Sequence, residues 1–201
     1  MNKINKRFLI LITSILIILS SVSAIASNII TRNFSYQAFL DALAKSESGG
    51  RYYIENSGHY LGKYQMGEAA LNDLGYFQST DNIFDNNYIG KWTGKNGVTS
   101  KNAFLKNPKA QEAAIREYMK ILWGYLKSNN SINYNGNIIN RIKITKSGLL
   151  GASFLVGAAD VKTYLITDGK VVSKDGNGVS LETYLKKFAG YHTSFNNGLE
   201  K

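Results

Sequence analysis

The chain of 201 residues carries 24 basic and 14 acidic side chains, a formal charge of +10, and no cysteine. The absence of cysteine excludes disulfide bonds and thiolate metal sites, and the presence of only two histidines argues against a zinc site. The basic residues are scattered, without an arginine-rich stripe or an aromatic RNA-binding motif, so we expect no nucleic-acid partner. The charge suits an anionic polymer or surface, although it would also serve solubility alone.

The first segment of the chain has the pattern of an export signal. Lys3, Lys6 and Arg7 precede an apolar run over residues 8–19, and a small-x-small cleavage site follows at residues 24–26. We therefore predict a signal peptide over residues 1–26, a short segment over 27–34 and one domain over 35–201 in a periplasmic or secreted protein. Cleavage would remove three basic residues and no acidic ones, lowering the formal charge from +10 to +7. An uncleaved anchor is the alternative, but the apolar run is shorter than the about 20 residues of a membrane span, so we expect no stable membrane insertion.

A short amphipathic helix is predicted to end at a carboxylate. Leu40, Leu43, Ala44 and Glu47 recur at i, i+3, i+4 and i+7, and the two glycines at 49–50 are typical of a helix C-cap. Burial and the negative end of the helix dipole would both favour the protonated form of Glu47. A protonated carboxyl is what a general acid for glycosidic cleavage requires, whereas a solvated glutamate at a frayed helix end is the alternative.

The segment over residues 75–107 combines aromatic side chains with Gly, Asn and Asp, which predicts a long irregular connection. Its Trp92 could stack on a sugar ring or anchor the packing of the loop itself. Asn107-Pro108 then starts a helix that reaches residue 126, with Glu112 and Glu117 assigned to the solvated face. The apolar face of that helix is predicted to contain Ala110, Ala114, Ile121, Leu122 and Tyr125.

The C-terminal third of the chain predicts two further helices separated by a polar connection. Residues 146–165 are apolar and rich in glycine, which indicates one buried central helix. Turn dipeptides over residues 168–178 predict a polar loop or a small hairpin, and the spacing of its acidic residues does not fit a calcium loop. Ser180 is expected to cap the last helix, whose apolar side contains Leu181, Tyr184, Leu185 and Phe188.

Glu47-Ser48 at a helix end, followed by the turn Gly62-Lys63-Tyr64-Gln65, resembles the lysozyme-like superfamily, in particular the soluble lytic transglycosylases and a branch of phage-type lysozyme-like domains. The resemblance resumes at residues 92–114 and 179–191. It implies an all-α, lysozyme-like single domain. Where the family carries A-Y-N-x-G, this chain has residues 153–157 with an aromatic residue and a glycine but no asparagine.

The resemblance implies an enzyme that cleaves peptidoglycan glycan strands. We expect it to be a monomer without a metal or cofactor. The resemblance assigns Glu47 as the acid and base, and Ser48, Tyr64, Gln65 and Phe154 as substrate-binding residues, with Tyr64 as an aromatic wall of the substrate groove. Ser48 could instead help to terminate the helix, and Tyr64 and Gln65 could instead be structural. A hydrolytic muramidase or chitinase-like enzyme would need a second carboxylate, for which Glu55, Glu68 and Asp73 are the candidates near in sequence, although each is expected to be a surface charge. A third alternative is a catalytically silent cell-wall-binding protein with the same fold.

Overall fold

The computed structural model describes residues 34–193, so the predicted signal peptide over residues 1–26 lies outside the described residues. The described chain forms one helix-rich domain with two small two-stranded sheets. Its α-helices are α2 (Tyr36–Ser48), α3 (Glu68–Asp73), α4 (Lys101–Leu105), α5 (Pro108–Ser128), α6 (Lys146–Val156), α7 (Ala158–Ile166) and α8 (Leu181–Lys187). Its strands are β1 (Phe77–Ser79), β2 (Gly90–Trp92), β3 (Ile138–Ile139) and β4 (Ile142–Lys143), and two 3-10 turns cover Lys95–Gly97 and Ser131–Tyr134.

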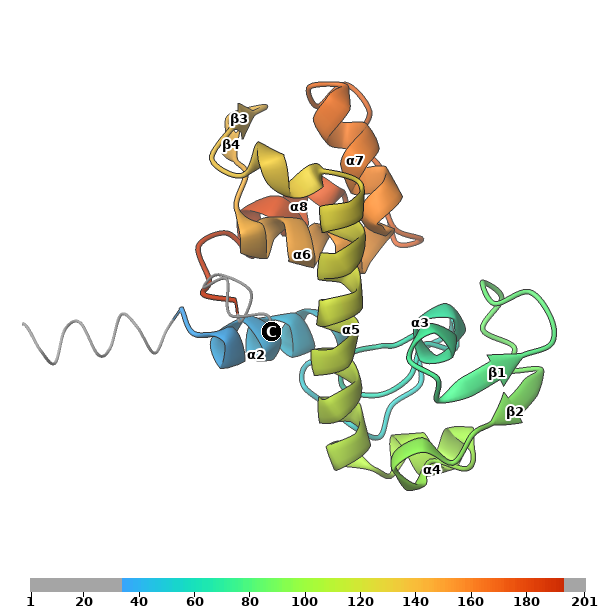
Figure 1. The fold of residues 1–201 in the computed structure, drawn as a ribbon. Helices are drawn as coiled ribbons and strands as arrows, with labels where there is room; N and C mark the ends of the chain where they lie inside the picture. Colours follow the sequence, from blue (N-terminus) through green and yellow to red (C-terminus); the bar gives the residue numbers. More distant parts are fainter. Residues whose placement is uncertain (1–33, 194–201) are drawn as a thin grey trace, which may run out of the picture.

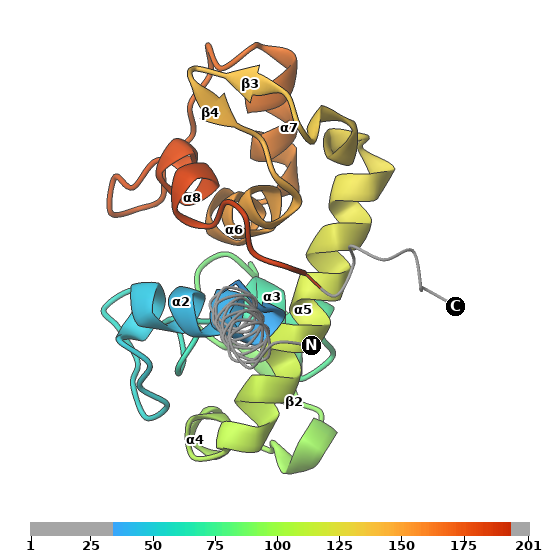
Figure 2. The same ribbon diagram turned by 90° about the vertical axis from the view of Figure 1, so that its left-hand side faces the viewer.

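The long helix α5 connects two groups of elements (Figure 1). Helices α6, α7 and α8 lie beside its C-terminal half, whereas α3, α4 and the β1–β2 sheet lie beside its N-terminal half. Helix α2 lies between the two groups, below α6 and α8 in both views (Figure 2). The C-terminal end of α2 is therefore reached by segments from both groups.

Helix α5 begins where the sequence predicts. Asn107 accepts a hydrogen bond from the backbone N–H of Ala110, and Pro108 occupies the first turn, where its missing N–H costs nothing. The predicted buried face needs correction at its C-terminal end, because Tyr125 is exposed and Ile121 only half-buried. The buried positions there are Met119, Leu122, Trp123 and Leu126.

The single helix predicted over residues 146–165 is wrong, because the chain breaks at Gly157. That residue has φ 84° and ψ 157°, and helices α6 and α7 on either side are bent by 120° relative to each other. Among residues 34–193 no single helix is long and apolar enough to cross a membrane, and only this bent pair reaches the required length and composition together.

Glycines in α6 allow α8 to approach closely. A Cβ atom on Gly148 would lie 2.8 Å from the Leu185 carbonyl oxygen, and one on Gly151 would lie 2.5 Å from the Phe188 ring. The prediction of a buried, close-packed helix is thus confirmed for α6.

The two small sheets lie outside residues 168–178, for which the sequence predicts a polar loop or a small hairpin. Residues 168–178 form turns closed by a single bridge between Lys174 and Ser180, whereas β1 pairs with β2 and β3 with β4 in antiparallel register. The 75–107 connection predicted to be irregular contains β1, β2 and α4. The last helix is confirmed, since Ser180 caps α8 by accepting from the Thr183 N–H.

Candidate functional site

Glu47 lies in the last turn of α2, which begins at its N-cap Ser35 and ends at Gly49 in the left-handed conformation. Leu40, Leu43 and Ala44 are buried and Glu47 is half-buried, so the predicted shared face is confirmed. The carboxyl group lies at the carbonyl end of the helix, where the dipole disfavours a negative charge.

Tyr184 of α8 is the direct partner of Glu47. Its hydroxyl donates a hydrogen bond of 2.5 Å to Glu47 Oε1. Burial raises the pKa of Glu47 above its ordinary value, and the hydrogen bond from Tyr184 offsets part of that increase by stabilising the carboxylate. The sequence placed Tyr184 on the apolar side of α8, where its ring is buried, but gave no signal that its hydroxyl reaches Glu47.

Two further charges act on Glu47 from the segment around α8. The carboxylate of Asp175 raises the pKa of Glu47, and the ammonium of Lys187 lowers it. Lys187 is held at the end of α2 by a hydrogen bond to Ser46, and Asp175 belongs to the turn before α8. In Figure 2 the connection between α7 and α8 lies on the same side of the molecule as the C-terminal end of α2. Asp175 thus acts on the pKa of Glu47 from this connection.

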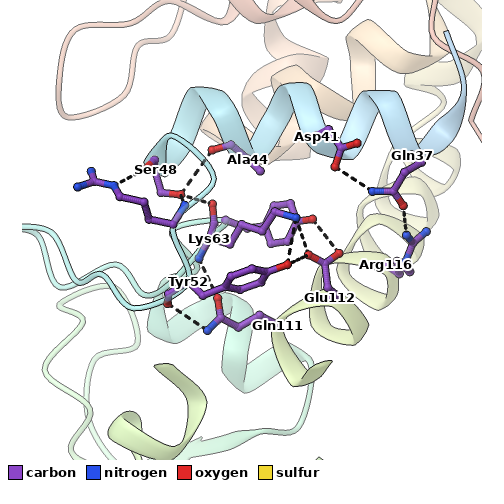
Figure 3. Close-up of polar contacts among 11 residues, drawn as sticks. Gln37, Asp41, Ala44, Ser48, Tyr52, Lys63, Gln111, Glu112 and Arg116 are labelled. Carbon is purple, nitrogen blue, oxygen red and sulfur yellow. Dashed lines mark hydrogen bonds and ion pairs between the residues drawn. The ribbon is translucent and has the colours of Figure 1, made fainter. Parts of the chain in front are cut away.

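Ser48 is buried and bonded within the protein. Its hydroxyl donates to the carbonyl oxygen of Lys63 at 2.7 Å and accepts from the backbone N–H of Arg51 at 3.0 Å (Figure 3). These bonds support the role of Ser48 at the end of the helix, where its hydroxyl connects α2 to the 62–65 turn.

Tyr64 is not a groove wall, because only 1% of it is exposed. Its hydroxyl donates to Glu112 Oε2 at 3.0 Å, and Lys63 Nζ lies 2.6 Å from Glu112 Oε1. The expectation that Glu112 faces solvent is therefore wrong. Although its partial burial acts to raise the pKa of Glu112, hydrogen bonds from Lys63, Tyr52 and Tyr64 lower it below the ordinary value.

Gln65 and Phe154 are engaged in local packing. Gln65 has a positive φ of 46°, is 9% exposed, and donates its side-chain amide to the Gly62 carbonyl oxygen at 2.8 Å within the same turn. The half-buried ring of Phe154 packs edge-on against Tyr118 of α5, with centroids 6.1 Å apart. The structure thus does not bring Phe154 into the group around Glu47.

The three carboxylates considered near Glu47 in sequence all have other partners. Glu55 pairs with Lys101 at 2.9 Å and with His59 at 2.6 Å. Glu68 was expected at the surface but is fully buried, where it accepts bonds from Ser79 and from the Tyr88 backbone. Asp73 accepts a hydrogen bond from Tyr125.

Trp92 belongs to the packing of its own segment. Its ring is half-buried and stacks on Tyr88 with centroids 5.9 Å apart, and it also contacts Phe77 and Phe104. Of the two roles open to Trp92 from the sequence, the structure supports that of a packing anchor.

Residues 34–193 contain no group of three or more His, Asp or Glu side chains that could hold a metal ion. Comparison with known proteins found no matching family model, no matching curated protein and no matching solved structure.

Proposed function

We propose that this protein is a glycosidase of the lysozyme-like class. Within that class, we propose an exported lytic transglycosylase that cleaves the β-1,4 bond between N-acetylmuramic acid and N-acetylglucosamine in peptidoglycan. The observation that carries the proposal is the half-buried Glu47 at a helix end, with a raised pKa and a 2.5 Å hydrogen bond from Tyr184. The proposal of peptidoglycan as the substrate comes from the resemblance of Glu47-Ser48 and the 62–65 turn to the lytic transglycosylases.

Cleavage of a glycosidic bond requires a proton for the leaving oxygen and stabilisation of a positively charged, oxocarbenium-like sugar. A carboxyl group whose pKa is raised keeps its proton closer to neutral pH and can donate it. In the proposed reaction Glu47 protonates the leaving oxygen. It then accepts the proton of the muramyl 6-hydroxyl, whose oxygen bonds to the anomeric carbon and forms a 1,6-anhydro sugar.

A single carboxylate suffices for that reaction, because the attacking hydroxyl belongs to the substrate. The ion pairs of Glu55 and the burial of Glu68 leave these residues poorly suited to activating a water beside Glu47. This favours transglycosylation over hydrolysis. The predicted signal peptide and the basic charge fit an exported protein that acts on an anionic polymer.

The test is mass spectrometry of the fragments that the protein without residues 1–26 releases from purified peptidoglycan, beside its Glu47→Gln variant. We expect anhydromuramyl products from the unsubstituted protein only, with glycan binding retained by Glu47→Gln. If the unsubstituted protein binds sacculi but releases no soluble fragment, the enzyme proposal fails and a cell-wall-binding protein takes its place.

A hydrolytic muramidase is the second candidate, and it is favoured by a second carboxylate, that of Asp175, whose charge raises the pKa of Glu47. Inverting glycosidases use a second carboxylate that activates water from across the sugar ring. Reducing-end products instead of anhydromuramyl ends would select this alternative. Cleavage of an N-acetylglucosamine oligomer without lactyl groups would point to a chitin-like substrate.

A further inference from the structure

Two consecutive residues of α5 each hold the same two segments of the chain. Gln111 accepts a hydrogen bond from the Lys63 backbone N–H at 2.8 Å and donates to the Tyr52 carbonyl oxygen at 3.2 Å. Glu112 pairs with the Lys63 ammonium at 2.6 Å and accepts from the Tyr52 hydroxyl at 2.8 Å. Gln111 thus binds the backbone of Tyr52 and Lys63, and Glu112 binds their side chains. We call these four residues the α5 clamp.

The clamp lies below the end of α2. In Figure 3 the Lys63 side chain runs beneath α2 towards Glu112, while Gln111 reaches the backbone on the opposite side of Tyr52. Gln111 is buried, and its amide also donates to the carbonyl oxygens of Phe104 and Leu105. Its position is therefore fixed from several directions.

The adjacent glycine leaves room for Gln111. A Cβ atom on Gly62 would lie 2.2 Å from Gln111 Oε1, which is closer than any real contact, and Gly62 has a positive φ of 72°. No other residue fits at position 62 while Gln111 keeps its bonds to Tyr52 and Lys63.

The clamp connects to Glu47 through one hydrogen bond. Lys63, whose backbone N–H and ammonium are both held by α5, presents its carbonyl oxygen to the Ser48 hydroxyl at 2.7 Å. Ser48 directly follows Glu47 at the end of α2. This bond therefore ties the last turn of α2 to a residue that α5 holds.

We propose that Gln111 and Glu112 are positioning residues for Glu47, acting through Lys63 and Ser48 to hold the carboxyl group against Tyr184. The expected change in kcat rests on the proposed function. The expected change in the pKa of Glu47 does not. A partly buried Lys–Glu pair that only stabilised the fold would be expected to alter unfolding without altering the environment of Glu47.

The test compares Glu112→Gln with Glu117→Gln. Glu117 is a matched control, because it lies on the same helix and pairs with Lys95 at 2.8 Å but has no contact with Lys63. We expect kcat of Glu112→Gln on peptidoglycan fragments to fall about tenfold with KM within about twofold, since small displacements of a reacting group cost rate more than binding. Glu117→Gln should keep both constants.

A readout that needs no activity is the pKa of Glu47, measured by carbon-13 NMR of its carboxyl group. The groups that act on Glu47 are Tyr184 and Lys187 of α8 and Asp175 of the preceding turn. Loosening the end of α2 admits water, which lowers the pKa of Glu47, and weakens the bond from Tyr184, which raises it. Because burial has the larger effect, the pKa of Glu47 should fall towards its ordinary value in Glu112→Gln and stay unchanged in Glu117→Gln.

Lys63→Met and Lys63→Arg provide a second pair of variants in case Glu112→Gln folds poorly. Methionine removes the ion pair, whereas arginine can restore it and should restore kcat and the pKa of Glu47. Equal kcat and an equal pKa of Glu47 in folded Glu112→Gln, Lys63→Met and the unsubstituted protein would overturn the proposal. A lack of cleavage by the unsubstituted protein, with the NMR differences present, would instead overturn only the proposed function.

Discussion

The hydroxyl of Tyr184 lies 2.5 Å from Oε1 of Glu47, although the two residues are 137 positions apart in the chain. Because a hydrogen bond to a carboxylate favours its charged form, this contact opposes the burial that raises the pKa of Glu47. The two largest effects on the pKa of Glu47 are thus its burial and a hydrogen bond from α8.

Replacing Tyr184 by phenylalanine should raise the pKa of Glu47 further, because the only direct donor to its carboxylate among the described residues is lost while the ring still fills the core. The limb of the pH–rate profile that falls with rising pH should move to higher pH. At the same time kcat should drop about tenfold or more, since the acid loses its orientation. A pKa of Glu47 that is lower in Tyr184→Phe than in the unsubstituted protein would contradict this prediction.

Replacing Asp175 by asparagine should lower the pKa of Glu47, because a negative charge that opposes its ionisation is removed. Asparagine keeps the oxygen that accepts from the N–H groups of Asn177 and Val179, so the turn should remain folded. NMR titration of Glu47 provides the measurement, with Asp160→Asn as a charge-matched control on α7. An unchanged pKa of Glu47 in Asp175→Asn would show that the two carboxylates do not interact.

Glu112 should make the protein sensitive to acid. Its pKa is lowered in the folded protein, so its contribution to stability is present above the ordinary value of 4.5 and is lost as pH falls through the folded pKa. The free energy of unfolding in urea should therefore decrease more between pH 5 and pH 3 in the unsubstituted protein than in Glu112→Gln. Equal decreases in the two proteins would refute the prediction that Glu112 contributes this pH-dependent stability.

Replacing Glu68 by alanine should lower the free energy of unfolding by about 1–3 kcal/mol, because the partly buried N–H of Tyr88 and the hydroxyl of Ser79 lose their acceptor. Tyr88 and Asn86 both have positive φ angles, and the loop that holds them depends on this carboxylate and on the bond from the Glu68 N–H to Asn86. Urea unfolding and hydrogen exchange of the Tyr88 amide test the effect. Glu68→Gln keeps an acceptor and should therefore lose less unfolding free energy than Glu68→Ala.

Gly62→Ala should cost more stability than Gly50→Ala. Both glycines have positive φ, so alanine strains the backbone at either position, but only at Gly62 would the new Cβ meet Gln111 at 2.2 Å. We expect a difference of about 1–3 kcal/mol between the two variants in urea unfolding, in line with overpacking of a close contact. Comparable losses in both would mean that Gln111 moves aside without cost.

The sequence by itself determined the features that depend on neighbouring residues. The periodic face that ends at Glu47, the Asn107-Pro108 start of α5 and the Ser180 cap of α8 were all predicted, because capping and helical periodicity act within one or two turns. The assignment of Glu47 as an acid also came from the sequence, and it stays a prediction until cleavage is measured.

The tertiary structure decided the partners of these residues, which depend on how distant segments fold together. The burial of Glu68, the ion pair between Lys63 and Glu112 across 49 positions and the bond from Tyr184 to Glu47 leave no mark in the local sequence pattern. The break at Gly157 was hidden for the same reason, since glycine is tolerated inside a helix and only packing determines whether the chain turns there. Local propensity thus placed the carboxyl group at a helix end, and long-range packing determined its partners and its pKa.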